Sequence, residues 1–184
     1  MLEDHPKNEG HSIGIKVRNL DNGDHAIEIV RNADALDYPA FSGKLSITGT
    51  LTKKGDRLHL HAKAASEGKF ECTRCTDPFS RVITAPLDLD FVPPGLMCDP
   101  DDPNIHVYDP LTSAYLDITE DVRDALALAI PMKHLCQSNC KGLCPSCGKN
   151  LNLEHCACKP AQETSGPWTA LKGVGERLRA EEEK

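Results

Sequence analysis

Six of the chain's nine cysteines lie in one short segment, residues 136–158. They run as Cys136-x3-Cys140-x3-Cys144-Pro-Ser-Cys147-Gly, followed by Cys156-Ala-Cys158. Two thiolates three residues apart can bind one tetrahedral ion, proline stiffens the turn between them, and the following glycine permits a positive φ. This pattern predicts a metal site, and zinc is the expected metal.

A second cysteine pair stands far upstream, at Cys72-Thr-Arg-Cys75. Such a pair can be a redox motif or half of a metal site. A thioredoxin-type redox pair should follow a strand and open a helix, whose dipole stabilises the thiolate. Here Pro78 and a β-like segment follow instead. We therefore favour a half-site that takes its other two ligands from elsewhere in the chain.

Together the two segments supply eight thiols, enough for two structural sites with four thiolates each. In the compact pairing, the first site holds Cys72, Cys75, Cys136 and Cys140, and the second holds Cys144, Cys147, Cys156 and Cys158. In the rival pairing, Cys136, Cys140, Cys144 and Cys147 share one ion, and Cys156 and Cys158 join the distant pair. We prefer the compact pairing, which would tie a β region to the C-terminal segment; a single occupied site remains an alternative. The ninth cysteine, Cys98, stands apart in an acidic segment and is not expected to be a ligand.

The ligand set indicates a structural metal rather than a catalytic one. Catalytic zinc keeps an open position, usually with His or carboxylate ligands, and the sequence offers no His-Glu-x-x-His pattern. Iron in a rubredoxin-like site fits less well because the spacing Cys156-x-Cys158 is irregular.

Other residues have simpler interpretations, since His59 and His61 alternate with leucines on a strand and are expected to face solvent. The remaining minority candidates are His134 and His155 as substitute ligands, Arg74 and Lys141 as phosphate contacts, and Trp168 as an RNA-stacking residue.

Charge is distributed unevenly along the chain. Residues 131–184 contain eight Lys or Arg and six Asp or Glu, a net charge of +2, whereas residues 1–130 contain 13 and 22, a net charge of −9. Bulk electrostatic binding of nucleic acid by the N-terminal part is therefore not expected.

The N-terminus lacks the pattern of a signal peptide, and no apolar run is long enough to span a bilayer. We expect a cytoplasmic protein with reduced thiols and no membrane partner.

Hydrophobic periodicity predicts an α+β fold with a β-rich antiparallel body, a C-terminal helix and a cysteine-rich zinc-binding segment. Residues 43–51 and 57–64 alternate on either side of a Lys-Lys-Gly-Asp turn and predict a hairpin, with Gly49 marking a bulge or a close backbone approach. Pro86 is expected to separate a strand at 87–91 from a shorter β-like run. The expected divisions are a flexible lead (1–11), the β-rich body (12–92), an acidic Pro-rich loop (93–110), a helix (111–131), the zinc-binding cluster (132–160), and a C-terminal helix and tail (161–184).

Several of these motifs occur in an order that resembles the YceD-like family, the large ribosomal RNA subunit accumulation proteins. The shared segments are Cys72-Thr-Arg-Cys75 with Pro78, Leu128-Ala-Ile-Pro131, Cys140-Lys-Gly-Leu-Cys-Pro-Ser-Cys-Gly-Lys-Asn-Leu-Asn152 and Pro167-Trp-Thr-Ala-Leu-Lys172. The run Cys-Lys-Gly-Leu-Cys-Pro-x-Cys-Gly is the most specific of them. The resemblance covers roughly residues 40 to 175.

The resemblance implies a non-enzymatic factor that acts in accumulation or processing of large-subunit ribosomal RNA, and therefore in ribosome assembly. The expected partner is that RNA or a pre-ribosomal particle, with no small-molecule substrate and with one or two structural zinc ions. A zinc-stabilised adaptor that contacts a ribosomal protein without binding RNA is the alternative. A thiol oxidoreductase using Cys72 and Cys75 is a distant third.

Overall fold

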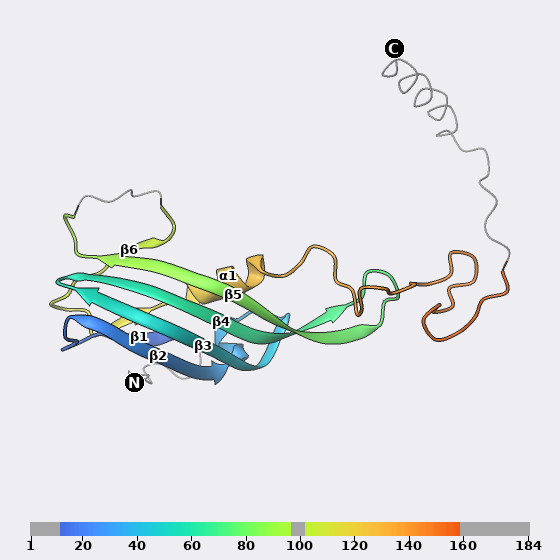
Figure 1. Cartoon of the computed structure of the whole chain (residues 1–184), viewed down its shortest axis with the longest axis horizontal. Coiled ribbons are helices and arrows are strands. Elements are labelled where there is room, and N and C mark those ends of the chain that lie inside the picture. Colours follow the sequence, from blue (N-terminus) through green and yellow to red (C-terminus); the bar gives the residue numbers. More distant parts are fainter. Residues whose placement is uncertain (1–11, 97–101, 159–184) are drawn as a thin grey trace, which may run out of the picture. The chain divides into compact units, whose positions relative to one another are not determined.

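The computed structural model describes residues 12–96 and 102–158 (Figure 1). Within these residues the chain forms two compact units. The first contains residues 12–72 and 77–136, and the second contains residues 73–76 and 137–158. The predicted N-terminal lead (1–11), Cys98, and the predicted C-terminal helix and tail (161–184) lie outside the described residues.

A five-stranded sheet forms the body of the first unit, in the order β2-β3-β4-β5-β6. Its neighbours are antiparallel except β5 and β6, which run parallel. The hairpin expected from residues 43–51 and 57–64 is confirmed by the pairing of β3 with β4. The strands are β2 (Gly23–Asn32), β3 (Phe41–Lys54), β4 (Arg57–Glu71), β5 (Pro78–Val92) and β6 (Ile105–Val107).

One face of this sheet carries the hydrophobic core. Alternating residues such as Ile47, Leu60 and Leu89 are buried, which is the period-two pattern of a sheet covered on one side. A layer of short elements covers this face: β1 (Gly14–Lys16), which pairs with β7 (Tyr115–Asp117), the 3-10 helix η1 (Ala33–Leu36), and α1 (Thr119–Leu128). The helix packs on β4, β5 and η1. The predicted α+β fold with a β-rich body is therefore confirmed.

Gly49 lies where β3 and β4 come into close contact. It faces Ala62 across the pair, and a Cβ atom at position 49 would overlap the carbonyl oxygen of His61 and the Cα of Ala62. Of the two alternatives that the sequence left open, the close approach is the correct one. The register shift of this hairpin lies elsewhere, between Ser42 and Leu45.

Two β predictions need correction. Pro86 does not separate two strands, because β5 continues through it opposite Lys63. Proline is tolerated there since β5 pairs with β6 only over Asp90–Val92, which leaves Pro86 at an open edge. Strand β6 was also not predicted, because it lies inside the Pro- and Asp-rich stretch that was expected to be a loop. Its neighbour Tyr108 is buried and donates a hydrogen bond to the Asp56 carbonyl.

The predicted helix begins later than residue 111. Residues 115–117 form β7 instead, and α1 starts at Thr119. The N-cap residue is Ile118, which makes no side-chain cap hydrogen bond. The carboxylate of Asp117, one residue earlier, accepts hydrogen bonds from the backbone N–H and the hydroxyl of Thr119. The carboxylate of Glu120 lies 3.8 Å from the Arg123 guanidinium. Val122 and Leu126 are fully buried, as the helical spacing predicts.

The second unit has little regular structure. An isolated β-bridge joins Leu143 to Asn150. Within its described part, the buried residues are Cys75, Cys140, Gly142 and Cys144. No helix in the described part of the chain is long and apolar enough to cross a membrane. An apolar core therefore stabilises the first unit, whereas in the second the cysteines occupy the protected positions.

Candidate metal centre

The structure gathers the eight predicted ligands into two groups of four thiols. The sulfur atoms within each group all lie within 4.8 Å of one another, and none of these cysteines forms a disulfide. The first group is Cys72, Cys75, Cys136 and Cys140, and the second is Cys144, Cys147, Cys156 and Cys158. This is the compact pairing; the rival pairing is not the grouping that the described structure adopts.

The end of the β4–β5 hairpin positions Cys72 and Cys75. Pairing with β3 reaches Gly68, and beyond this point β4 and β5 continue as a two-stranded ribbon to Glu71 and Pro78. At its tip the N–H of Cys72 donates to the Asp77 carbonyl, 3.0 Å away. Thr76 has a φ of 60°, which turns the chain back into β5. Both sulfurs thus belong to a tight turn between two strands and not to a strand–helix junction.

Contacts with the same ribbon hold the segment before Cys136. The ring of His134 stacks on Phe70, with 5.0 Å between ring centroids. The Arg81 guanidinium donates to the Leu135 carbonyl at 2.9 Å. These contacts bring Cys136 to the pair at 72 and 75. They also give His134 a packing role, and it is not a member of either thiol group.

Cys140 is tied to the turn at Arg74 by reciprocal hydrogen bonds. Arg74 Nη1 donates to the Cys140 carbonyl at 2.8 Å, and the Leu143 N–H donates to the Arg74 carbonyl at 3.0 Å. Gly142, at a φ of 75°, permits this approach, because a Cβ there would lie 2.9 Å from the Arg74 oxygen. The arginine and the glycine of the two motifs therefore have a local structural function.

The second group forms around the Cys144-Pro-Ser-Cys147 turn. The Gly148 N–H donates to the Cys144 carbonyl at 2.9 Å, and the Cys144 N–H donates to the Lys149 carbonyl at 2.8 Å. Cys156 Sγ lies 3.4 Å from Cys144 Sγ and 3.5 Å from Cys147 Sγ. These separations are far longer than a disulfide bond of about 2.05 Å. They approach the edge of about 3.8 Å that a zinc–sulfur bond of about 2.3 Å gives in a tetrahedron.

The thiols of the second group have unequal acidities. Backbone N–H groups of Cys147 and Ser146 donate to Cys144 Sγ and lower its pKa to about 6. The pKa of Cys158 is raised to about 12, first because of its hydrogen bond with Cys156 and then because of that with Cys147. One thiolate is thus favoured without a cation, while a neighbouring thiol keeps its proton unless a positive charge binds.

Asn152 is the residue at this centre that sequence reasoning did not single out. Its side-chain nitrogen lies 3.3 Å from Cys140 Sγ, and its side-chain oxygen accepts from the Lys141 N–H at 2.8 Å. In the sequence, Asn152 ends the Gly-Lys-Asn-Leu-Asn run that follows the Cys-Pro-Ser-Cys turn, and this position was the only available sign of its role. It contacts a cysteine of the first group from within the loop of the second.

The minor candidates take other places. His59 and His61 lie on the sheet face opposite the core, and His59 contacts Asp88 at 3.3 Å and Asp90 at 3.2 Å. His155 is exposed and belongs to neither thiol group. Lys141 is exposed too, whereas Trp168 lies outside the described residues. The expectation that the two strand histidines face solvent is confirmed.

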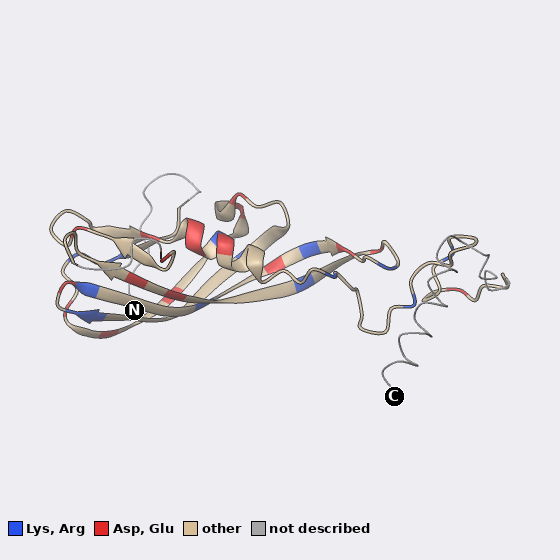
Figure 2. Cartoon of the chain, turned by 90° about the horizontal axis from the view of Figure 1, so that it is seen from above, with Lys and Arg blue, Asp and Glu red and all other residues tan. Residues whose placement is uncertain are grey.

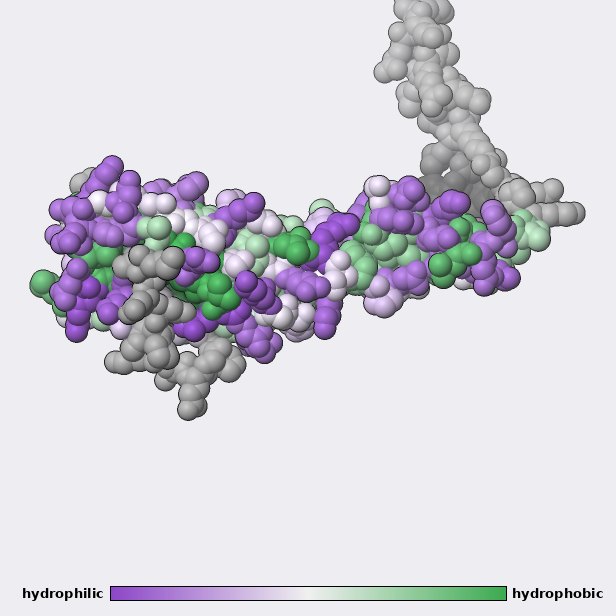
Figure 3. Space-filling view, turned by 60° about the horizontal axis from the view of Figure 1, so that its bottom comes forward, coloured by the Kyte–Doolittle hydropathy of each residue, from purple (hydrophilic) through white to green (hydrophobic). Residues whose placement is uncertain are grey.

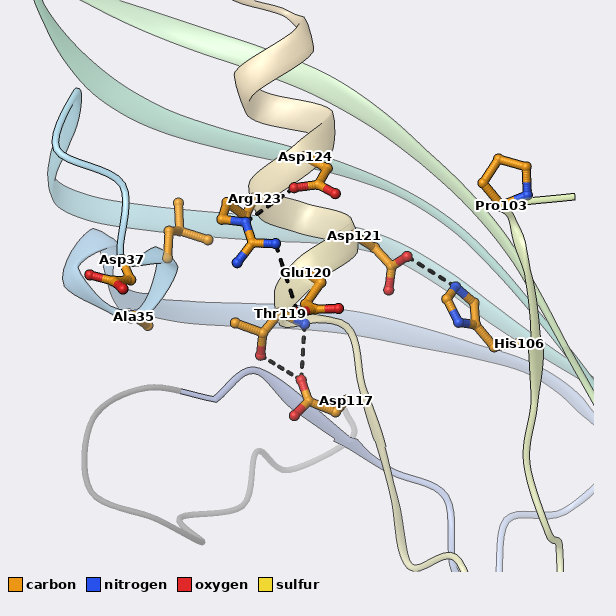
Figure 4. A pocket seen from close by; sticks show the side chains of 11 residues that line it. Ala35, Asp37, Pro103, His106, Asp117, Thr119, Glu120, Asp121, Arg123 and Asp124 are labelled. Atoms are coloured by element: carbon orange, nitrogen blue, oxygen red, sulfur yellow. Dashed lines mark hydrogen bonds and ion pairs between the residues drawn. The ribbon is translucent and has the colours of Figure 1, made fainter. Parts of the chain in front are cut away.

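Away from the cysteines, the first unit has a cavity of about 720 Å³ beside the start of α1. Five of its eleven lining residues are acidic: Asp37, Asp117, Glu120, Asp121 and Asp124 (Figure 4). His106 lies 3.0 Å from Asp121 within it. In Figure 2 the red, acidic positions of the ribbon include several on the helix. The face shown in Figure 3 carries both hydrophilic and hydrophobic areas. Leu128 and Met132 are among the exposed apolar side chains of the described residues.

Comparisons with known proteins agree with the arrangement of motifs. The chain is 28% identical over 182 residues to a chloroplastic "Large ribosomal RNA subunit accumulation protein YCED homolog 1" of Zea mays, a match covering 77% of this chain and 61% of that protein. It is 34% identical over 67 residues to the Arabidopsis thaliana protein of the same name, covering 36% of this chain and 21% of that protein. An uncharacterized protein of Mycobacterium tuberculosis is 30% identical over 108 residues, covering 53% of this chain and 52% of that protein.

The chain thus spans less than two thirds of the length of these relatives. No solved structure matches it. The family described as "Large ribosomal RNA subunit accumulation protein YceD" matches residues 58–174, which include all eight clustered cysteines. The chain therefore belongs to the YceD family.

Proposed function

We propose that the protein is a non-enzymatic, zinc-binding factor that acts in large-subunit ribosomal RNA accumulation or processing, and so in ribosome assembly. The observation that carries the proposal is the presence of two four-thiol groups inside the part of the chain that matches the family. The ribosomal assignment is supported by the family description and by the names of the plant relatives.

The proposed metal is zinc, with one structural ion in each group. Within the described residues, both groups consist of cysteines alone, so an ion bound by all four has no open position for a water nucleophile. Each filled site would carry a net charge of about −2. An ion in the first group would join the turn at 72–75 to residues 136–140, and an ion in the second would close the loop 144–158.

RNA crosslinking in cells tests the ribosomal part. Large-subunit ribosomal RNA should be recovered with the tagged protein after ultraviolet crosslinking and stringent washing. Recovery should fall in a Cys144→Ser/Cys147→Ser variant and stay unchanged in His61→Ala, on the open sheet face. If no ribosomal RNA is recovered while the purified protein still contains zinc, the RNA role is wrong and the metal proposal stands.

A protein adaptor is the second candidate, and the charge of the chain favours it. Residues 1–130 carry a net charge of −9, and carboxylates crowd the cavity beside α1. Such a surface attracts basic proteins and repels nucleic acid. Chemical crosslinking of the purified protein with ribosomal particles would then recover a basic ribosomal protein and no RNA.

The oxidoreductase alternative has less support, because Cys72 and Cys75 lie in a turn between two strands. Disulfide reductase activity that disappears in Cys72→Ser would revive it.

We further propose that the protein acts in the cytoplasm, since its thiols need a reducing compartment to bind metal. Cell fractionation tests this, and recovery in a membrane or secreted fraction would contradict it.

A further inference from the structure

We propose that Asn152 positions the Cys140 thiolate and couples the two metal sites, so that an ion in the second group strengthens binding in the first. This inference rests on the proposed zinc binding. It concerns a residue that is not itself a ligand. Four hydrogen bonds of one amide carry it.

The Asn152 side chain uses its full hydrogen-bonding capacity. Its nitrogen donates to Cys140 Sγ at 3.3 Å and to Asn150 Oδ1 at 2.8 Å. Its oxygen accepts from the Lys141 N–H at 2.8 Å and from Gln137 Nε2 at 3.3 Å. If the amide were flipped, its oxygen would face the sulfur of Cys140 and its NH₂ group would face the N–H of Lys141. Two donors and two acceptors therefore fix the amide in one orientation.

This orientation positions the sulfur of Cys140. The donor aimed at Cys140 Sγ restricts the direction of its lone pairs. The oxygen of the same amide holds the backbone of the next residue, Lys141. The side chain thus restrains the ligand at its sulfur and at its main chain. Outer contacts of this kind commonly change metal affinity by about 10–100-fold.

The backbone holding Asn152 belongs to the loop of the second group. The Leu151 N–H donates to the Gly142 carbonyl at 2.9 Å, and Leu143 and Asn150 form a β-bridge. The ligands Cys147 and Cys156 flank this loop on either side. An ion bound by the second group would restrict the loop and hold Asn152 on Cys140. Linkage requires the reverse effect to be equal, so an ion in the first group should strengthen the second.

Cobalt(II) titration of the metal-free full chain, followed by the thiolate-to-cobalt absorption band and by competition with a chelator, tests the proposal. The wild-type chain should bind two ions. Asn152→Ala should also bind two, with one affinity reduced about 10–100-fold. Asn152→Asp keeps the acceptor for Lys141 but places a carboxylate oxygen against the sulfur, so it should bind more weakly than Asn152→Ala. Glu154→Gln is the matched control, because it removes only the exposed pair with Lys149 at 3.0 Å and should match wild type.

Variants that retain one group separate positioning from coupling. In Cys144→Ser/Cys147→Ser, which retains the first group, affinity should already be reduced and the further effect of Asn152→Ala should shrink. In Cys72→Ser/Cys75→Ser, which retains the second group, Asn152→Ala should change nothing. Equal losses from Asn152→Ala in wild type and in the first background would overturn the coupling, and wild-type affinity in Asn152→Asp would overturn the positioning. A wild-type chain that binds no cobalt would instead contradict the metal proposal itself.

Discussion

The carbonyl of Arg74 accepts a hydrogen bond from the N–H of Leu143, 3.0 Å away, although the two residues are 69 positions apart in the sequence. This bond joins the Cys-Thr-Arg-Cys turn to the Cys-Lys-Gly-Leu-Cys run. It leaves no room for a side chain at Gly142. The specific residues between the cysteines thus determine how the two cysteine motifs fit together.

Gly142→Ala should weaken metal binding more than Gly148→Ala. Both glycines have a positive φ, 75° and 72°, so alanine introduces strain on the order of 1 kcal/mol at either position. Only at 142 does the new Cβ also meet backbone, the Arg74 oxygen at 2.9 Å; at 148 nothing lies within 4 Å. Zinc affinity, measured by competition with a chromogenic chelator, compares the two. Equal losses would contradict the close approach.

Removal of metal should affect the two units differently. The hydrophobic core lies within the first unit, whereas the buried residues in the described part of the second are three cysteines and a glycine. Zinc coordination by a small domain can supply about 10 kcal/mol or more of folding free energy. After chelation, amide hydrogen exchange should accelerate across residues 137–158 and remain slow in β3 and β4. Unchanged exchange in 137–158 would show that the second unit folds without metal.

The candidate ligands could be identified from the sequence because their chemistry is local. Spacing such as Cys144-x2-Cys147 shows that two sulfurs can share one ion, and ligand counting then suggested the pairing seen in the structure. The hairpin of β3 and β4 was predictable for the same reason, since its alternation and turn are adjacent in the chain. In both cases short-range pattern and tertiary structure agree.

The rest depends on long-range contacts that no local pattern contains. Pro86 should interrupt a strand, yet it is accommodated because β6 covers only the far end of β5. Strand β6 itself is three residues long and exists through pairing with β5. Asn152 gains its significance from Cys140, 12 positions away, which the loop of the second group brings within reach.

Gly49→Ala should destabilise the sheet strongly. A Cβ at this position would overlap the His61 carbonyl and Ala62, which are backbone neighbours on β4 and have little freedom to move. Overpacking of this kind costs about 1–3 kcal/mol or more. Gly14→Ala is the matched control, because its Cβ would lie 3.8 Å from the nearest atom, in ordinary contact. Urea unfolding followed by circular dichroism should give a lower midpoint for Gly49→Ala alone, and equal midpoints would contradict the packing.

Metal affinity of the second group should depend on pH in two regimes. Binding displaces protons from thiols, so affinity rises with pH wherever a ligand is still protonated in the metal-free protein. Above pH about 6, Cys144 is already a thiolate, whereas Cys158, with its pKa raised to about 12, still has to lose a proton. Below pH about 6, Cys144 binds a proton as well, and one more must be displaced for each ion. The slope of log affinity against pH should therefore steepen as pH falls through this value. Cobalt titrations of Cys72→Ser/Cys75→Ser between pH 5 and 8 measure the slope, and a constant slope across this range would contradict the lowered pKa of Cys144.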